Sequence, residues 1–211
     1  MPMSQLPSSI HYLSHHELQS LQLSTHDITA SIEHLLLERS RKVAWNAPKT
    51  VIIPPDGRYM MATLAAADDP PLLAVKALVL NPDNPKNGLE SINALVTLLD
   101  SRSGLPLAIV DGNWVTAVRT AGLSAVAAKR LARPDASIAT FIGCGVQAHS
   151  HLQAFAELFP LKQIYAFGRG TVSRDTFCRN AEDMGFSVIL TRTAREAIQA
   201  ADIIVTSVTL S

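Results

Sequence analysis

The fold is decided by the stretch Ile138-Ala139-Thr140-Phe141-Ile142-Gly143-Cys144-Gly145-Val146-Gln147-Ala148, an apolar run that ends in the pattern G-x-G-x-x-A. A strand, such a glycine pattern and a following helix are together typical of a turn that binds a dinucleotide. The first glycine permits the tight turn, the second lets the backbone approach a pyrophosphate, and the alanine lets helix and strand pack closely. The helix N-terminus also offers free N–H groups to phosphates. We therefore predict a dinucleotide site formed by Gly143, Gly145, Val146, Gln147 and Ala148, with a glycine turn that binds nothing as the alternative.

The residues around this stretch alternate between strand and helix patterns. An Ala-rich helix is predicted over residues 118–133 and ends before Pro134, because a helix interior cannot accommodate proline. Strands are predicted at 138–142, 163–167, 187–190 and 202–206, and helices at 146–159, 172–184 and 193–200. This alternation indicates βαβ units and a parallel sheet. His149 and His151 are expected on the surface of the helix after the glycine turn.

The first half of the chain has a different pattern of apolar and turn-forming residues. A capped amphipathic helix is predicted over residues 24–41, and strands at 50–53, 59–61, 72–80, 95–99 and 107–110. The Gly-containing turn at 100–104 predicts an antiparallel hairpin, and the turn-rich residues 81–88 predict a loop. We therefore predict an α/β protein in which an N-terminal α+β domain (1–117) precedes a Rossmann-type parallel-sheet domain (118–211).

The charge and cysteine content narrow the class of ligand. Eighteen basic residues balance eighteen acidic ones without long runs of like charge, which argues against nucleic acid or an anionic membrane surface as a partner. The two cysteines, Cys144 and Cys178, form no C-x-x-C pair, so neither a disulfide framework nor a metal site is expected. No apolar run reaches the ~18 residues of a membrane span, and the first six residues lack the pattern of a secretory leader. We expect a cytoplasmic protein with a small-molecule ligand.

The choice between the two nicotinamide cofactors depends on the end of the second predicted Rossmann strand. NAD enzymes typically have an acidic residue there for the ribose hydroxyls, but this chain reads Gly168-Arg169-Gly170-Thr171. Arg169 and Thr171 could instead receive a 2′-phosphate, which favours NADP(H) over NAD(H), while a solvated arginine in a turn is the alternative. Thr206, at the end of the last predicted strand, is expected at the same edge of the sheet and completes the predicted cofactor residues.

Three segments of the chain carry a resemblance to a known family. They are residues 111–122 (Asp-Gly-Asn-Trp-Val-Thr-Ala-Val-Arg-Thr-Ala-Gly), residues 131–135 (Leu-Ala-Arg-Pro-Asp) and residues 142–148. They resemble the ornithine cyclodeaminase/mu-crystallin family, and the likeness extends upstream through residues 103–108 and 76–88, so that it covers roughly residues 45–209. The resemblance implies hydride chemistry at the α-carbon of an amino acid: cyclodeamination of ornithine or lysine, reduction of a cyclic ketimine such as pyrroline-2-carboxylate, or amino acid dehydrogenation. It also implies a homodimer formed through the first-half sheet.

The resemblance implies roles for five residues that contact the substrate. Arg119, in the R-T-A motif, would clamp a carboxylate, with an interdomain salt bridge as the alternative. Lys76, in an apolar strand, would be the catalytic group for proton transfer, with a structural ion pair as the alternative. Lys49 lies where many members have a second substrate arginine, so it is a possible carboxylate contact. Met61 matches a methionine of the substrate-pocket wall, with packing in the core as the alternative. Asn84 matches an asparagine in the loop over the substrate, with an Asx turn as the alternative.

The end of the chain affects the expected activity. The resemblance implies an acidic catalytic residue after the fourth Rossmann strand, in a segment that this chain does not reach. Asp111 is expected to have a helix-start or domain-junction role instead. A Rossmann domain usually has about six strands, whereas four are predicted before Ser211. We therefore expect a truncated domain, with impaired or absent catalysis for the 211 residues alone. A cofactor-binding protein without turnover, as the crystallin members suggest, is the second hypothesis.

Overall fold

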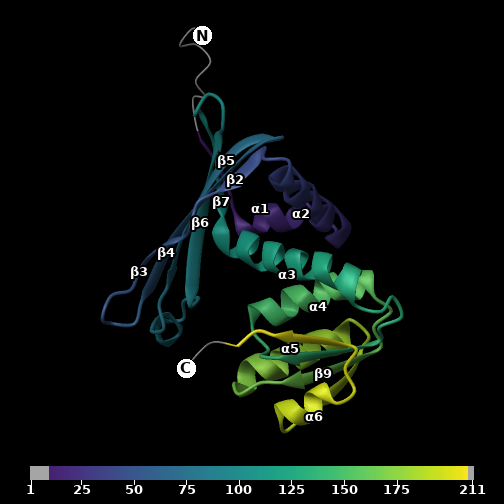
Figure 1. The fold of residues 1–211 in the computed structure, drawn as a ribbon. Helices are drawn as coiled ribbons and strands as arrows, with labels where there is room; N and C mark the ends of the chain where they lie inside the picture. The colour runs from purple at the N-terminus through teal and green to yellow at the C-terminus, as the bar shows by residue number, and fades with distance from the viewer. Residues whose placement is uncertain (1–9, 209–211) are drawn as a thin grey trace. The chain divides into compact units, whose positions relative to one another are not determined.

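The computed structural model describes residues 10–208, which divide into two compact units (Figure 1). The first unit consists of residues up to Leu23 together with Glu33–Thr116, and the second of Ser24–Ile32 together with the residues from Ala117 onward. The predictions made from the first six residues and from the chain end at Ser211 concern residues outside the described range. Between residues 10 and 208, no helix has both the length and the apolar content needed to cross a membrane.

The first unit is built on a mixed seven-stranded sheet. Its path is β1-β7-β6-β5-β4-β2, with β3 also paired to β4, and all neighbours except β1 and β7 run antiparallel. The strands are β1 (His11–Leu13), β2 (Ala44–Asn46), β3 (Thr50–Ile52), β4 (Tyr59–Asp68), β5 (Pro71–Leu80), β6 (Ile92–Asp100) and β7 (Pro106–Asp111). The predicted hairpin between the last two strands and the predicted loop before β6, which contains the short 3-10 turn η2 (Asn84–Asn87), are both confirmed.

The two faces of this sheet have different surroundings. Side chains alternate along a strand, so the register divides them into two sets. The inner face carries Val96 and Val110, which are both 7% exposed and form a small core with Leu18 of helix α1 (His15–Ser20) and with Trp114. The outer face carries residues such as Val79 and Leu95, which stay substantially exposed.

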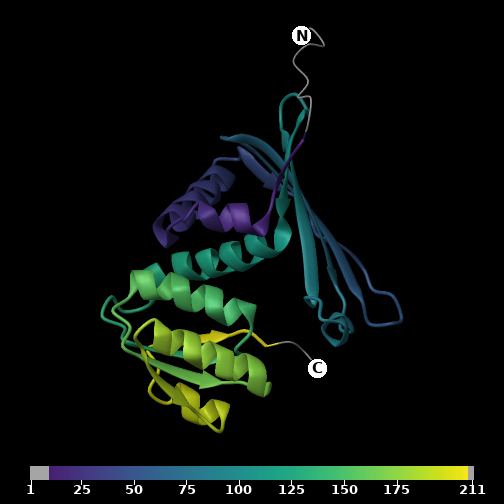
Figure 2. The ribbon, with the colours of Figure 1, turned by 180° about the vertical axis from the view of Figure 1, so that it is seen from behind.

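The second unit contains the parallel four-stranded sheet that the sequence predicts. Its order is β10-β9-β8-β11, and all three pairings are parallel. Between residues 117 and 208, the ribbon of this unit runs from teal through green to yellow in Figures 1 and 2. The strands are β8 (Ile138–Ile142), β9 (Gln163–Phe167), β10 (Ser187–Leu190) and β11 (Ile203–Thr206), and the helices after the first three are α4 (Val146–Leu158), α5 (Thr171–Asp183) and α6 (Ala194–Ile198). Ala139, Thr140 and Phe141 are all fully buried, so both faces of β8 are covered, as is usual for a parallel strand. The predicted α/β fold class is confirmed.

Two long helices contain residues of both units. Helix α2 (Thr25–Ser40) begins with the predicted cap, in which Asp27 N donates to Ser24 Oγ at 3.2 Å. Helix α3 (Gly112–Leu131) begins at Gly112 rather than at residue 118. Asp111 Oδ1 accepts a hydrogen bond from Trp114 N at 2.7 Å, which caps the first turn and confirms the helix-start role expected for Asp111.

Gly112 determines how closely α3 can start beside the sheet. A Cβ at this position would lie 2.5 Å from the carbonyl carbon of Ala94 in β6 and 2.7 Å from its oxygen. These are backbone atoms, which cannot move aside as the end of a flexible side chain can. The first turn of α3 therefore requires glycine at this place.

The variant Gly112→Ala is expected to lower the free energy of unfolding by about 1–3 kcal/mol, the usual range for overpacking. Urea denaturation followed by circular dichroism measures this change. Gly145→Ala is the matched control, because a Cβ at Gly145 meets no atom within 4 Å and the backbone there is extended, with φ −87° and ψ −166°. If both variants unfold at the urea concentration of the parent, α3 does not start this close to β6.

Candidate functional site

The predicted dinucleotide turn connects β8 to α4 and holds its first glycine in a strained conformation. Gly143 has φ +91°, a region that favours glycine, and a Cβ there would collide with the carbonyl oxygen of Ser207. Ser207 follows β11, and its N–H donates to Ile142 O at 2.8 Å. The turn therefore fits against the end of β11 only because position 143 lacks a side chain.

The second glycine of the turn leaves open space at the start of α4. Gly145 is the N-terminal cap of this helix and supplies no side-chain hydrogen bond, so the first helical N–H groups have no cap. Ala148 is fully buried, whereas Val146 is 58% exposed. The Oε1 atom of Gln147 is buried and has no hydrogen-bond partner within the described residues. An open cradle with uncapped N–H groups fits the pyrophosphate of a dinucleotide.

Three strand ends meet at this edge of the sheet. Thr206 is paired with Ile142, and Phe167 is also paired with Ile142, so β8, β9 and β11 end side by side. Arg169 and Thr171 follow β9 and are exposed, and Gly170 caps helix α5. The predicted cofactor residues thus lie around one edge of one sheet.

Cys144 connects the glycine turn to the end of β9. Its thiol is 4% exposed and donates to Phe167 O at 3.7 Å, and a Cβ at Gly168 would lie 3.1 Å from its sulfur. Burial raises the pKa of Cys144 to about 11, so the side chain stays a neutral thiol at physiological pH. Cys144 and Cys178 are both free cysteines.

The surface position predicted for His151 is wrong. Its ring is 5% exposed, with Nδ1 2.6 Å from Gln147 O and Nε2 2.9 Å from Ser124 Oγ of α3. Burial lowers its pKa, which favours a neutral ring. The sequence signal for this burial was helical spacing: Ala148, Leu152 and Phe155 form a buried apolar stripe on α4, and position 151 lies on the same stripe. His149 is half-buried against Phe177, with ring centroids 5.2 Å apart.

Lys76 and Met61 lie on the same inner face of the first-unit sheet. Met61 is opposite Leu78 in the register, and Lys76 is two residues before Leu78 and opposite Thr63. Lys76 is half-buried and its Nζ donates to Thr116 Oγ1, in the first turns of α3, at 3.4 Å. Sequence reasoning did not single out Thr116, although it belongs to the segment that carries the family resemblance.

The other three predicted substrate residues have different environments. Lys49 is exposed and precedes β3, and Arg119 is exposed on α3, three positions after Thr116. Asn84 starts η2, and its Nδ2 donates to Glu90 O at 2.8 Å, so this amide group stabilises its own loop. No group of three His, Cys, Asp or Glu side chains within residues 10–208 is placed to hold a metal ion.

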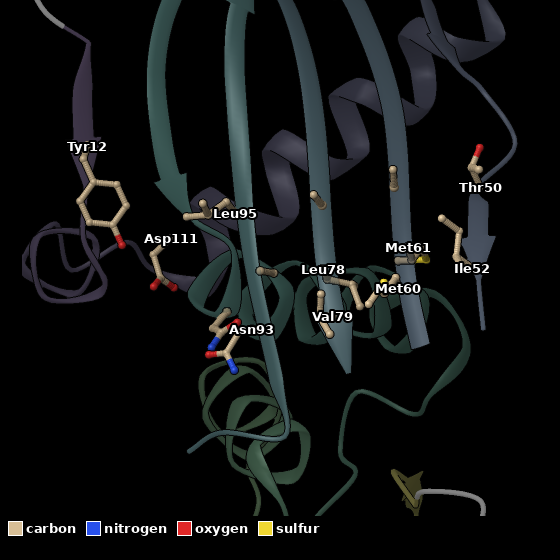
Figure 3. Close-up of a pocket in the computed structure, with 14 residues that line it drawn as sticks. Tyr12, Thr50, Ile52, Met60, Met61, Leu78, Val79, Asn93, Leu95 and Asp111 are labelled. Atoms are coloured by element: carbon tan, nitrogen blue, oxygen red, sulfur yellow. The ribbon is translucent and has the colours of Figure 1, made fainter. Parts of the chain in front are cut away.

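A groove of about 610 Å³ lies beside strands β3 to β6 of the first-unit sheet, and its lining includes residues that the register places on both faces, such as Val79 on the outer and Leu78 on the inner face (Figure 3). Tyr12, Asn93 and Asp111 lie toward one end, and Ile52 and Met60 toward the other. The full lining is Tyr12, Thr50, Ile52, Met60, Met61, Ala62, Ala77, Leu78, Val79, Asn93, Ala94, Leu95, Asp111 and Asn113. Apolar side chains dominate this groove, and Lys76 is not among its lining residues.

Comparisons of the sequence and of the structure with known proteins identify the same family of relatives. The model of the ornithine cyclodeaminase/mu-crystallin family matches residues 11–211. The ketimine reductase mu-crystallin of Rattus norvegicus is 33% identical over 147 residues, which are 70% of this chain and 45% of that protein. The structure of Δ1-pyrroline-2-carboxylate reductase from Thermococcus litoralis, in complex with NADH and L-proline, has 32% identity and a TM-score of 0.88, with 93% of this chain and 61% of that chain covered. An archaeal alanine dehydrogenase dimer with bound NAD has 29% identity and a TM-score of 0.85, with coverage of 94% and 60%. The chain thus spans less than half the length of the curated relative.

Proposed function

The chain belongs to the ornithine cyclodeaminase/mu-crystallin family, and on this premise we propose that its protein is an NAD(P)-dependent oxidoreductase that transfers a hydride at the α-carbon of an amino acid or cyclic imino acid. Reduction of a cyclic ketimine such as pyrroline-2-carboxylate is the reaction we propose to assay first. The observation that carries the proposal is the glycine turn at the edge where β8, β9 and β11 end, with open space at Gly145. Similarity to ketimine and pyrroline-2-carboxylate reductases supports it.

We assign the cofactor to the turn and the neighbouring strand ends. Gly143, Gly145, Val146, Gln147 and Ala148 would hold the pyrophosphate, and the orphaned Gln147 oxygen would accept a hydrogen bond from the bound molecule. Arg169 and Thr171 would bind the 2′-phosphate of NADP(H), and Thr206 would border the nicotinamide half. A bound nicotinamide would supply the hydride chemistry at the α-carbon of the substrate.

We propose a separate role for each of the residues that would contact the substrate. Arg119 would hold the substrate carboxylate with two parallel hydrogen bonds, and Lys76 would give a proton to the imine nitrogen or take it back. Met61, on the same sheet face as Lys76, would form an apolar wall. Lys49 and Asn84 would add polar contacts at the margin of the site. The assignment of residues 1–117 to substrate binding and dimerisation, and of residues 118–211 to the cofactor, is part of this proposal, as is the cytoplasmic location.

Replacing Arg119 tests the carboxylate clamp. Arg119→Ala removes charge-assisted hydrogen bonds worth about 1.5–3 kcal/mol, so kcat/KM for pyrroline-2-carboxylate should fall by roughly tenfold to a hundredfold. Steady-state kinetics with NADPH measure this loss. Arg195→Ala, at an exposed position of α6, is the control and should leave kcat/KM within about twofold. Parent-like kinetics for Arg119→Ala would remove Arg119 from the substrate site.

Arg169 is the residue that we propose to select the cofactor. Arg169→Ala should weaken NADPH binding about tenfold or more, because a guanidinium–phosphate pair is lost, and should leave NADH binding nearly unchanged. Calorimetry with both cofactors measures the two affinities, and Arg179→Ala, exposed on α5, is the control. Equal losses for both cofactors would contradict the selective role. Binding of neither cofactor to the parent protein would overturn the oxidoreductase proposal, and binding without turnover would favour the crystallin-like alternative.

We propose that a second copy of the chain covers the outer face of the first-unit sheet. The register places on this face the exposed apolar side chains Trp45 (51% exposed), Ile52 (62%), Leu64 (44%), Val79 (37%) and Leu95 (48%). An apolar patch of this kind typically marks an interaction surface. The dimer in the structure of the similar archaeal alanine dehydrogenase supports a homodimer.

The charge-introducing variant Leu95→Lys should convert the dimer to a monomer, because it would bury an unpaired ammonium in the proposed interface. Light scattering after size-exclusion chromatography gives the mass of each species. Leu131→Lys is the control, since Leu131 lies near the end of α3, is 86% exposed and is not on this face. A parent protein that is already monomeric at micromolar concentration would refute the proposal.

A further inference from the structure

The first turns of α3 bring a hydroxyl group to the amine of Lys76. We propose that Thr116 is a positioning residue that orients the Lys76 amine in both of its protonation states. This inference rests on the proposed function, since it assigns Lys76 to proton transfer. The contact that motivates it is the 3.4 Å distance between Lys76 Nζ and Thr116 Oγ1.

The side chain of Lys76 is flexible, and the neighbouring strands place a threonine and a valine opposite it. The residue lies in the middle of β5, opposite Thr63 on β4 and opposite the buried Val96 on β6. A lysine side chain is flexible and loses substantial rotamer freedom when it is held in one place. Threonine is β-branched, so a helix restricts its χ1 mainly to two rotamers and its hydroxyl to few directions.

The position of Thr116 is itself fixed by the start of α3. Asp111 caps the first turn through Trp114 N at 2.7 Å, and Gly112 places this turn against the backbone of Ala94. Thr116 follows about one turn later, on the part of α3 that belongs to the first unit. The cap and the glycine therefore determine where the hydroxyl meets the lysine.

A hydroxyl suits a group that must gain and lose a proton. In the proposed reduction, the C=N double bond gains a hydride at carbon and a proton at nitrogen, and Lys76 Nζ loses that proton. A hydroxyl oxygen accepts a hydrogen bond from the ammonium, and after the transfer its O–H can donate to the lone pair of the neutral amine. A carboxylate in the same place would hold the ammonium by its charge and oppose the transfer. Thr116 thus orients the amine without favouring one state by a full charge.

The kinetic test compares two variants that differ by the hydroxyl. Thr116→Val removes the hydroxyl at nearly constant volume, and Thr116→Ser keeps it. In the full protein with NADPH and pyrroline-2-carboxylate, Thr116→Val should lower kcat roughly tenfold and move the midpoint of the pH–rate profile to lower pH, with KM within about threefold. Thr116→Ser should keep kcat and the pH profile close to those of the parent. Parent-like values for Thr116→Val would overturn the proposal.

A double-mutant cycle separates positioning from a general structural effect. In the Lys76→Met background, Thr116→Val should cause no further loss of kcat, because the group that Thr116 orients is already absent. A further tenfold loss in that background would show that Thr116 acts independently of Lys76 and would refute the inference.

A measurement without turnover distinguishes failure of this inference from failure of the proposed function. An amine-specific acylating reagent reacts only with neutral lysine, and peptide mass spectrometry measures the labelling rate of Lys76. Thr116→Val should raise this rate several-fold at fixed pH, because the ammonium loses an acceptor that stabilises it. An unchanged rate overturns the contact between Thr116 and Lys76 even if the protein turns over. A raised rate in a protein that neither binds a dinucleotide nor turns over would instead confirm the contact and refute only the proposed function.

Discussion

The close approach of a helix start to a strand at Gly112 constrains the rest of the first unit. A helix whose first turn lies against the backbone of Ala94 has little freedom to shift along β6. The cap from Asp111 then sets the helical phase of the following residues. Because Trp114, Val115 and Thr116 follow within the first two turns, both the small apolar core and the contact to Lys76 depend on one position without a side chain.

The second unit has a comparable constraint at the glycine turn, but there several neighbours share it. Gly143 meets the backbone of Ser207 after β11, and Cys144 donates to the carbonyl of Phe167 at the end of β9. His151 connects the carbonyl of Gln147 to Ser124 on α3. The turn is thus held from three sides while Gly145 stays open, which is the combination that a backbone site for an anionic group requires.

The sequence predicted the second unit better than the first, for a physical reason. Buried parallel strands are short continuous apolar runs between helices, and the bounds of β8, β9 and β10 match the predicted ranges. Strands β1 and β2 have three residues each and are largely exposed, so they have no apolar pattern from which they could be predicted. The first turns of α3 were not predicted because Asn113 and Thr116 are polar and interrupt the apolar helical pattern. His151 was misjudged because its residue type was given more weight than its place on the buried stripe of α4. The contact of Lys76 with Thr116 joins residues 40 positions apart, which no local pattern encodes.

Because side chains alternate along β5, this strand contributes residues to two different surfaces, one on each face of the sheet. Lys76 and Leu78 point to one face of the sheet, and Ala77 and Val79 to the other. Substitutions at even-numbered positions therefore alter the chemistry next to Lys76, and those at odd-numbered positions alter the surface that we assign to a second copy. Our two proposals together imply that substrate and assembly can be altered separately, by changing alternate residues of the same ten-residue strand. An insertion of a single residue in β5 would reverse the facing of every residue on one side of it and so disturb both faces at once.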